Sequence, residues 1–203
     1  ATKTYSELIV NIERDCNSSK KYWNFVKVMG RSASHVALEC ALETQANICL
    51  IGEEVAAKKQ SLAEIANKIA DAVETRGNKG ENFGVAIIPE GIVEFVPEFS
   101  KLIAEINELL AGGKTEEFNA LPSWEDKYAF IERGLTAESM MVFSILPTGI
   151  QQQLFLERDP HGNVQVSLIE SEKLFAELVK AELAKRKAAG TYKGKCGFMT
   201  HFF

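Results

Sequence analysis

Three short segments place polar or charged residues directly after apolar runs that are typical of buried strands. They are Met29–Arg31, Gly52–Glu54 and Pro89–Gly91. An arginine beside a helix N-terminus suits a phosphate or carboxylate, because the guanidinium fork and the free backbone N–H groups both favour an anion. A carboxylate such as Glu90 repels phosphate but accepts hydrogen bonds from hydroxyl groups. Together these residues favour a ligand that carries both kinds of group, such as a sugar phosphate.

Each of these residues also has a purely structural interpretation. An arginine after a strand is often a surface ion-pair partner, and a glutamate after a proline can simply lie in a turn. Other chemistries have less support, because no G-x-G-x-x-G motif follows a strand and the chain lacks G-x-x-x-x-G-K-[ST]. The adjacent Ser34 and His35 point to different faces of a helix and cannot form a nucleophile and base pair.

Composition limits the class of protein and its partners. The chain has 203 residues, of which 46% are hydrophobic and 25% charged, enough for one sizeable core. Its net charge of -5 argues against nucleic acid or an anionic membrane as the main partner, since both require a concentrated basic patch. The 4 cysteines are widely spaced and the 3 histidines scattered, which indicates reduced thiols and gives no metal site. We expect a globular cytoplasmic protein.

Apolar periodicity predicts an alternation of strands and helices. Strands are expected over 23–30, 47–52, 82–91, 164–169 and 195–203, and helices at the N-terminus and over 34–43, 61–77, 97–111 and 171–189. The alternation implies an α/β fold, a parallel sheet with helices on both faces. Helices alone over about 121–156 indicate a helical insert. In such sheets ligands bind beyond the carboxyl ends of the strands, so the three polar segments should lie at one edge.

The same residues resemble the phosphofructokinase family, and most closely its long pyrophosphate-dependent members. The stretch 20–55 is similar to the family's Met-Gly-Arg segment and 83–98 to its Pro-Glu-Gly segment. The stretch 156–174, which contains the predicted turn RDPHGN at 158–163, is similar to a segment of the long enzymes. These blocks occur in consistent order over nearly the whole chain.

The resemblance implies a domain that binds fructose 6-phosphate. It assigns the grip on this sugar phosphate to Met29, Gly30 and Arg31, and the contact with the sugar hydroxyls to Glu90. For the whole enzyme it implies a glycolytic phosphoryl transfer from pyrophosphate to fructose 6-phosphate, with Mg²⁺. The residues that bind the phosphate donor and the catalytic aspartate are expected outside the chain. We therefore expect a fragment truncated at both ends, with no catalytic residue or Mg²⁺ site, inactive by itself.

The resemblance also implies a homodimer. Residues just before the first strand of the family reach into the neighbouring subunit's site, and Lys21 and Tyr22 match that location.

Three alternatives stay open. The chain could come from an ATP-dependent member or from a non-catalytic regulatory subunit, because the residues that distinguish these are expected outside it. It could instead be an interaction module whose docking face is formed by apolar residues of the insert, although apolar residues at helical spacing are more often core. The candidates for that face are Trp124, Tyr128, Phe130, Met140, Met141 and Phe143.

Overall fold

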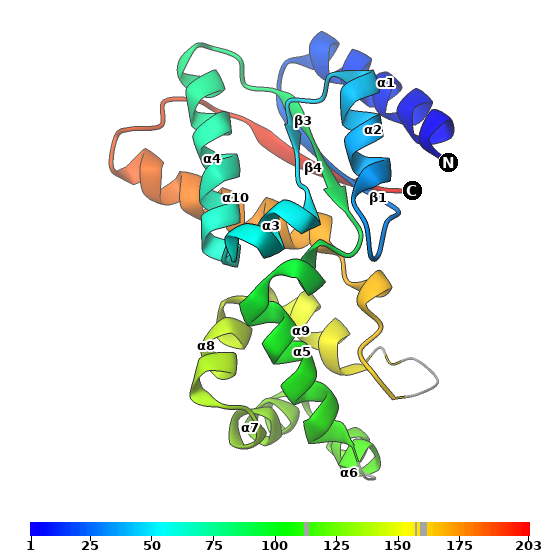
Figure 1. Ribbon diagram of the computed structural model, residues 1–203. Coiled ribbons are helices and arrows are strands. Elements are labelled where there is room, and N and C mark those ends of the chain that lie inside the picture. The colour runs from blue at the N-terminus through cyan, green and yellow to red at the C-terminus, as the bar shows by residue number, and fades with distance from the viewer. Residues whose placement is uncertain (112–113, 157, 159–161) are drawn as a thin grey trace. The chain divides into compact units, whose positions relative to one another are not determined.

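The computed structural model describes residues 1–111, 114–156, 158 and 162–203 (Figure 1). The chain divides into two compact units. The first comprises Ala1–Val96 and Glu170–Phe203, and the second comprises Pro97–Ile169. The first unit is α/β and the second is helical, so each is described by itself.

A parallel sheet forms the centre of the first unit. Its four strands, among the described residues, run in the order β2-β3-β1-β4. Their bounds are β1 Tyr22–Val28, β2 Ile48–Cys49, β3 Gly84–Pro89 and β4 Gly197–Phe202. The central strand β1 pairs in parallel with β3 and with β4, and β2 pairs in parallel with β3. The carboxyl ends of these strands therefore lie at the same edge, which confirms the predicted fold class.

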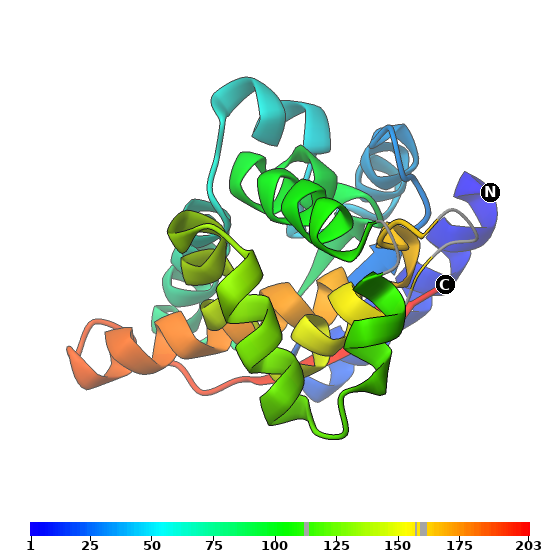
Figure 2. The ribbon, with the colours of Figure 1, turned by 90° about the horizontal axis from the view of Figure 1, so that it is seen from below.

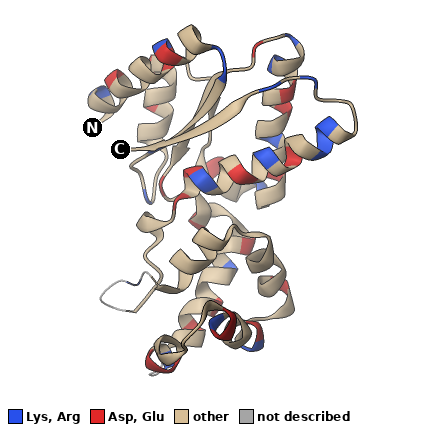
Figure 3. Ribbon diagram, turned by 180° about the vertical axis from the view of Figure 1, so that it is seen from behind, with Lys and Arg blue, Asp and Glu red and all other residues tan. Residues whose placement is uncertain are grey.

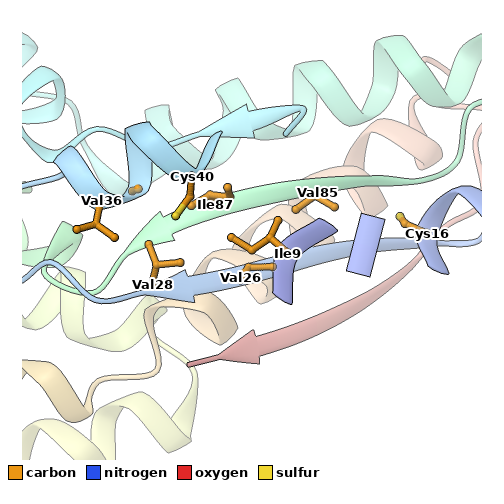
Figure 4. Packing of buried hydrophobic residues seen from close by; sticks show 9 residues of the cluster. Ile9, Cys16, Val26, Val28, Val36, Cys40, Val85 and Ile87 are labelled. Carbon is orange, nitrogen blue, oxygen red and sulfur yellow. The ribbon is translucent and has the colours of Figure 1, made fainter. Parts of the chain in front are cut away.

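Helices cover both faces of this sheet. On one face, α1 (Thr2–Ser19) and α2 (His35–Thr44) pack against β1 and β3. Figure 4 shows that packing, in which apolar side chains of the two helices meet alternate residues of the two strands. The cluster consists of Ile9, Cys16, Val26, Val28, Val36, Ala37, Cys40, Val85 and Ile87. Because side chains alternate along a strand, Trp23 and Phe25 are buried on the opposite face.

The opposite face is covered by α4 (Leu62–Asn78) and α10 (Ser171–Ala188), which also contact each other. The predicted capping box begins α4: the Ser61 hydroxyl accepts from the Glu64 N–H at 3.2 Å, and the Glu64 carboxylate accepts from the Ser61 N–H at 2.8 Å. Charged residues of both signs lie along α10 in Figure 3. One of them, Arg186, donates to Asp71 and Glu74 of α4 and so joins the two helices.

The second unit consists of helices around an aromatic core. Their bounds are α5 Pro97–Leu110, α6 Lys114–Ala120, α7 Trp124–Gly134, α8 Ala137–Ile145 and α9 Thr148–Leu156. In Figures 1 and 2, α5 lies beside α8 and α9, in agreement with their contacts. The rings of Phe118 and Phe143 both pack on Phe155, with centroids 5.2 and 5.6 Å apart. The compact unit thus extends beyond the helical stretch predicted over 121–156.

Of the six residues proposed for a docking face, Phe143 is fully buried and Met141 is 71% exposed. The other four are half-buried. The group is therefore divided between core and surface.

Two predicted strands differ from the structure. The strand expected over 47–52 is only Ile48–Cys49, half-buried at the sheet edge, because α3 (Gly52–Lys58) begins three residues later. The strand expected over 164–169 is wrong: a 3-10 turn, η2 (Val166–Leu168), occupies it. Val164 and Val166 are buried, but Leu168, which the same alternation would place beside them, is exposed. Within the described part of the chain, Val164 pairs in a single bridge with Arg158 and meets no full strand.

One prediction falls partly outside the residues that the structure describes. The predicted turn over 158–163 includes residues 159–161, which lie outside the described residues. Among the described helices, none is both long enough and apolar enough to cross a membrane.

Candidate functional site

The sheet brings two of the predicted polar segments into direct backbone contact. The Glu90 N–H donates to the Val28 carbonyl at 2.9 Å, and the Gly91 N–H donates to the Gly30 carbonyl at 3.3 Å. These bonds continue the pairing of β1 with β3 beyond the ends of both strands. The loop of Arg31 and the loop of Glu90 therefore lie side by side at the carboxyl edge, as the sequence predicts.

This contact leaves no space for side chains at two glycines. A Cβ at Gly91 would lie 1.8 Å from the Arg31 carbonyl oxygen. Gly30 has φ +138°, a conformation that L-residues rarely adopt, and a Cβ there would lie 2.6 Å from the Ala33 carbonyl oxygen. The two loops can approach this closely only because both positions are glycine.

The third polar segment joins the same edge at the start of α3. The Gly52 N–H donates to the Ser34 hydroxyl at 2.8 Å, and the Glu53 carboxylate accepts from the Ser34 N–H at 3.0 Å. The hydrogen bond from the Ser34 N–H is the largest cause that holds the pKa of Glu53 below its usual value. Gly52 also packs on Phe95 of the 3-10 turn η1 (Ile92–Phe95), since a Cβ at Gly52 would lie 2.4 Å from that ring. The third segment thus contacts residues that follow the other two segments closely in the chain.

Two charged side chains pair on the surface of this edge. The Arg31 side chain is 60% exposed, and its Nε lies 3.4 Å from a carboxylate oxygen of Glu94 in η1. Met29 is 46% exposed, and Glu90 is half-buried on the adjoining segment. The edge therefore presents the Arg31 guanidinium to solvent, beside the Glu94 carboxylate.

Comparison with known proteins identifies the family. The model of the family described as "PFK: Phosphofructokinase" matches residues 1–121 of this chain. The chain belongs to the phosphofructokinase family. It is 52% identical over 203 residues to the pyrophosphate--fructose 6-phosphate 1-phosphotransferase of Treponema pallidum (strain Nichols). It is 51% identical over 211 residues to the Entamoeba histolytica protein of that name and 50% identical over 203 residues to the Arabidopsis thaliana subunit beta 1.

These alignments include 100% of the chain but only 35%, 38% and 34% of the respective relatives. The chain thus spans about a third of the length of the relatives that it matches. The family resemblance read from the Met-Gly-Arg and Pro-Glu-Gly segments is confirmed.

Lys21 and Tyr22 lie at the other end of β1 in this phosphofructokinase chain. Tyr22 is the first residue of the strand and is 39% exposed, while the Lys21 carbonyl accepts from the Gly197 N–H at 2.9 Å. At about 3.3 Å per residue, the strand separates Tyr22 from Met29 by roughly 23 Å and Lys21 from Met29 by roughly 26 Å. One chain therefore does not bring Lys21 and Tyr22 together with Arg31.

A buried ion pair beneath the edge was missed by sequence reasoning. Lys27, in the penultimate position of β1, is 9% exposed, and its Nζ lies 3.7 Å from a carboxylate oxygen of Glu172 in α10. Glu172 is 1% exposed, and burial raises its pKa. The ammonium also lies 5.6 Å from the centre of the Phe202 ring, so this pair links β1, β4 and α10. A lysine inside a largely apolar run was the available signal.

A polar hollow of about 190 Å³ lies away from these segments. Its lining includes Glu13 of α1, Asn47 before β2, and Arg76 of α4. It also includes Phe83 and Gly84, where β3 begins, which places the hollow at the amino edge of the sheet. Within the described residues, no group of three or more histidine, cysteine, aspartate and glutamate side chains is arranged to hold a metal ion.

Proposed function

We propose that this chain is the fructose 6-phosphate-binding part of an enzyme that transfers a phosphoryl group from pyrophosphate to fructose 6-phosphate. The observation that carries this proposal is the backbone contact of the Gly30 and Gly91 loops, in a chain about half identical to proteins with that name. The contact supports a single ligand shared by Arg31 on one loop and Glu90 on the other.

In this proposal the chain positions the acceptor. Met29, Gly30 and Arg31 form one side of the grip: the guanidinium holds an anionic phosphate group, and the residue without Cβ lets the sugar approach the backbone. Glu90 accepts hydrogen bonds from the sugar hydroxyls and so fixes the ring. Phosphoryl transfer depends mainly on positioning and charge stabilisation, so holding the acceptor in line with pyrophosphate is a direct contribution to rate. The base that removes the hydroxyl proton would come from outside this chain.

We also propose that the full-length enzyme is a cytoplasmic, glycolytic homodimer in which Lys21 and Tyr22 complete the partner's site. Their position at the amino end of β1 supports this, since they are too far from Arg31 to share its ligand within one chain. Mg²⁺ stays a prediction for the full-length enzyme, where it would neutralise phosphate charge. Of the carboxylates at this edge, Glu94 pairs with Arg31 and Glu53 accepts from the Ser34 N–H.

Replacement of Arg31 by alanine in the full-length enzyme tests this function. Loss of a desolvated, charged hydrogen-bond donor costs about 2–3 kcal/mol, so the KM for fructose 6-phosphate should rise by about 30- to 150-fold. The KM for pyrophosphate should change far less. Steady-state kinetics with each substrate varied in turn would measure both. Arg133→Ala, which removes an exposed arginine of α7, is the matched control and should change neither value.

Two results would contradict the proposed function. Equal increases in the two KM values would show that Arg31 does not act on the sugar phosphate in particular. Turnover with ATP and none with pyrophosphate would show that the proposed phosphate donor is wrong.

A further inference from the structure

We propose that Ser34 and Glu53 form a positioning pair, which holds the Met29–Arg31 loop in the shape that binds the sugar phosphate. This inference rests on the proposed function and extends it to two residues that do not themselves touch the sugar. Neither residue is one of the three in Met29–Arg31 or in Pro89–Gly91.

Ser34 makes two hydrogen bonds that run in opposite directions, one with Glu53 and one with the preceding residue, Gly52. Ser34 donates its N–H to the Glu53 carboxylate at 3.0 Å and accepts the Gly52 N–H on its hydroxyl at 2.8 Å. Ser34 is only 2% exposed, so water does not easily replace either partner. Both the backbone and the side chain of Ser34 are thereby fixed to the first turn of α3.

These bonds anchor one end of a loop whose other end is also fixed. Gly30 is tied to Gly91 by the 3.3 Å backbone bond, and Ser34 lies four residues later. Between them, the Ala33 carbonyl folds back to where a Cβ of Gly30 would be, only 2.6 Å away. Arg31 thus lies on a short, tightly folded segment between two anchors, of which Ser34 is the second.

The anchor matters because the Arg31 side chain has little other support. It is 60% exposed, and its ion pair with Glu94 is a single contact at 3.4 Å on the surface. A ligand must otherwise order both this side chain and the backbone that carries it, and that ordering reduces affinity. A preorganised backbone leaves only the side chain to be ordered. Removal of the anchor should therefore weaken sugar-phosphate binding without altering the pyrophosphate site.

Glu53 is the better residue to test, because it is exposed and its replacement leaves the core intact. In the full-length enzyme, Glu53→Ala should raise the KM for fructose 6-phosphate about tenfold and leave kcat and the KM for pyrophosphate within about twofold. Glu53→Gln keeps an oxygen acceptor for the Ser34 N–H but loses the charge, so it should restore most of the affinity. Ser34→Ala should change the KM in the same direction as Glu53→Ala.

Glu54→Ala is the matched control. Glu54 is the next residue of α3 and carries the same charge, but its carboxylate pairs with Lys58 and Lys68 rather than with Ser34. We expect no change in KM. If charge near the anion were the important factor, Glu53→Gln and Glu53→Ala would both lower the KM, and that result would overturn the inference.

Combination with Arg31→Ala separates this inference from the proposed function. If the pair acts through the loop, Glu53→Ala should add much less to the KM in the Arg31→Ala background than in the wild-type background. A KM unaffected by Arg31→Ala would overturn the proposed function itself. A raised KM in Arg31→Ala together with an unchanged KM in Glu53→Ala would overturn only the positioning pair. A lowered Tm with equal changes for both substrates would show a merely structural role and would also overturn it.

Discussion

Arg31 illustrates how a single exposed side chain can be prepared for an anion. Its ion pair with Glu94 is 3.4 Å long, with the two side chains 60% and 34% exposed. Surface pairs of this kind are worth about 0.2–1 kcal/mol, so a phosphate group with several charged oxygens can displace Glu94 at small cost. The backbone, by contrast, is fixed by Gly30 and Ser34. Affinity at this site should therefore depend more on the anchors of the loop than on the resting partner of the guanidinium.

Gly91 provides a stability test of the contact between the two loops. A Cβ at this position would lie 1.8 Å from the Arg31 carbonyl oxygen, which belongs to the backbone and cannot rotate away. Gly91→Ala must therefore push the loops apart, at a cost of about 1–3 kcal/mol. Thermal unfolding followed by circular dichroism should show a Tm lower by several degrees, since each kcal/mol is worth about 2–4 °C in a domain of this size.

Gly149→Ala is the control for that experiment. Gly149 lies in α9, and a Cβ there would meet nothing within 4 Å among the described residues. Because alanine favours a helix over glycine, this variant should keep its Tm or gain slightly. An unchanged Tm in Gly91→Ala would contradict the close approach of the Arg31 and Glu90 loops.

At the scale of the elements, local sequence signals predicted most of the fold of the first unit. The capping box of Ser61 and Glu64 located the start of α4, and the apolar runs located β1 and β3. The expected strand over 164–169 failed because a strand is defined by its partner, and alternation alone does not supply one. The predicted length of β2 was wrong for a related reason, because the sequence does not show how soon after this strand α3 begins.

The sequence predicted where the candidate site lies, but not the hydrogen bonds that hold its loops. Parallel strands put their carboxyl ends at one edge, so the meeting of Arg31 and Glu90 loops follows from the order of elements. The bonds of Ser34 to Gly52 and Glu53 do not follow, because they depend on how two loops from different crossovers fold onto each other. The order of elements predicts that these residues lie at the same edge of the sheet, but it does not predict which of them are in contact.

A chain of hydrogen bonds connects β4 to α1 across β1. His201 Nε2 donates to the Asn24 Oδ1 at 2.9 Å, and the Asn24 amide donates to Cys16 Sγ at 3.3 Å. The Cys16 thiol in turn donates to the Tyr22 carbonyl at 3.1 Å. Because a carbonyl can only accept, Cys16 must be protonated, and burial raises its pKa accordingly. Because the Asn24 Oδ1 can only accept, the neutral His201 ring carries its proton on Nε2. The other ring nitrogen, Nδ1, is the one that gains a proton at acid pH.

His201 should make stability fall toward acid pH. Burial lowers its pKa below the unfolded value of 6.5, so the unfolded chain binds more protons as the pH falls through that value. The stability contributed by neutral His201 is therefore present above pH 6.5 and is lost as the pH falls toward the folded pKa. Urea unfolding at pH values above and below this window should show a larger loss for the wild type than for His201→Gln, which cannot titrate.

Two carboxyl groups act in the opposite sense. Burial raises the pKa of Glu13 and of Glu172, so they favour the folded state as the pH falls. They are present in both proteins, and their effect cancels when the wild type is compared with His201→Gln. An equal loss of unfolding free energy in the two proteins would show that His201 does not contribute to the acid sensitivity.

On the scale of the whole molecule, the helical unit is part of what the chain shares with its relatives. The family model ends at residue 121, within the second unit, whereas the alignments with the Treponema and Arabidopsis proteins include the entire chain. The residues from 122 onward are thus similar to these proteins although they lie outside the family model's match. The α/β unit carries the candidate site, and the helical unit has an aromatic core of its own.

Separate cores predict that the two units lose structure separately. Phe143 is fully buried in the second unit and packs on Phe155, so Phe143→Ala should destabilise that unit by about 3–5 kcal/mol. Hydrogen exchange followed by mass spectrometry should then show faster exchange in peptides from 97–169 and little change elsewhere. Phe25→Ala, which removes a fully buried ring of the first unit, should give the reverse pattern. Faster exchange throughout the chain in both variants would instead mean that the two cores unfold as one cooperative body.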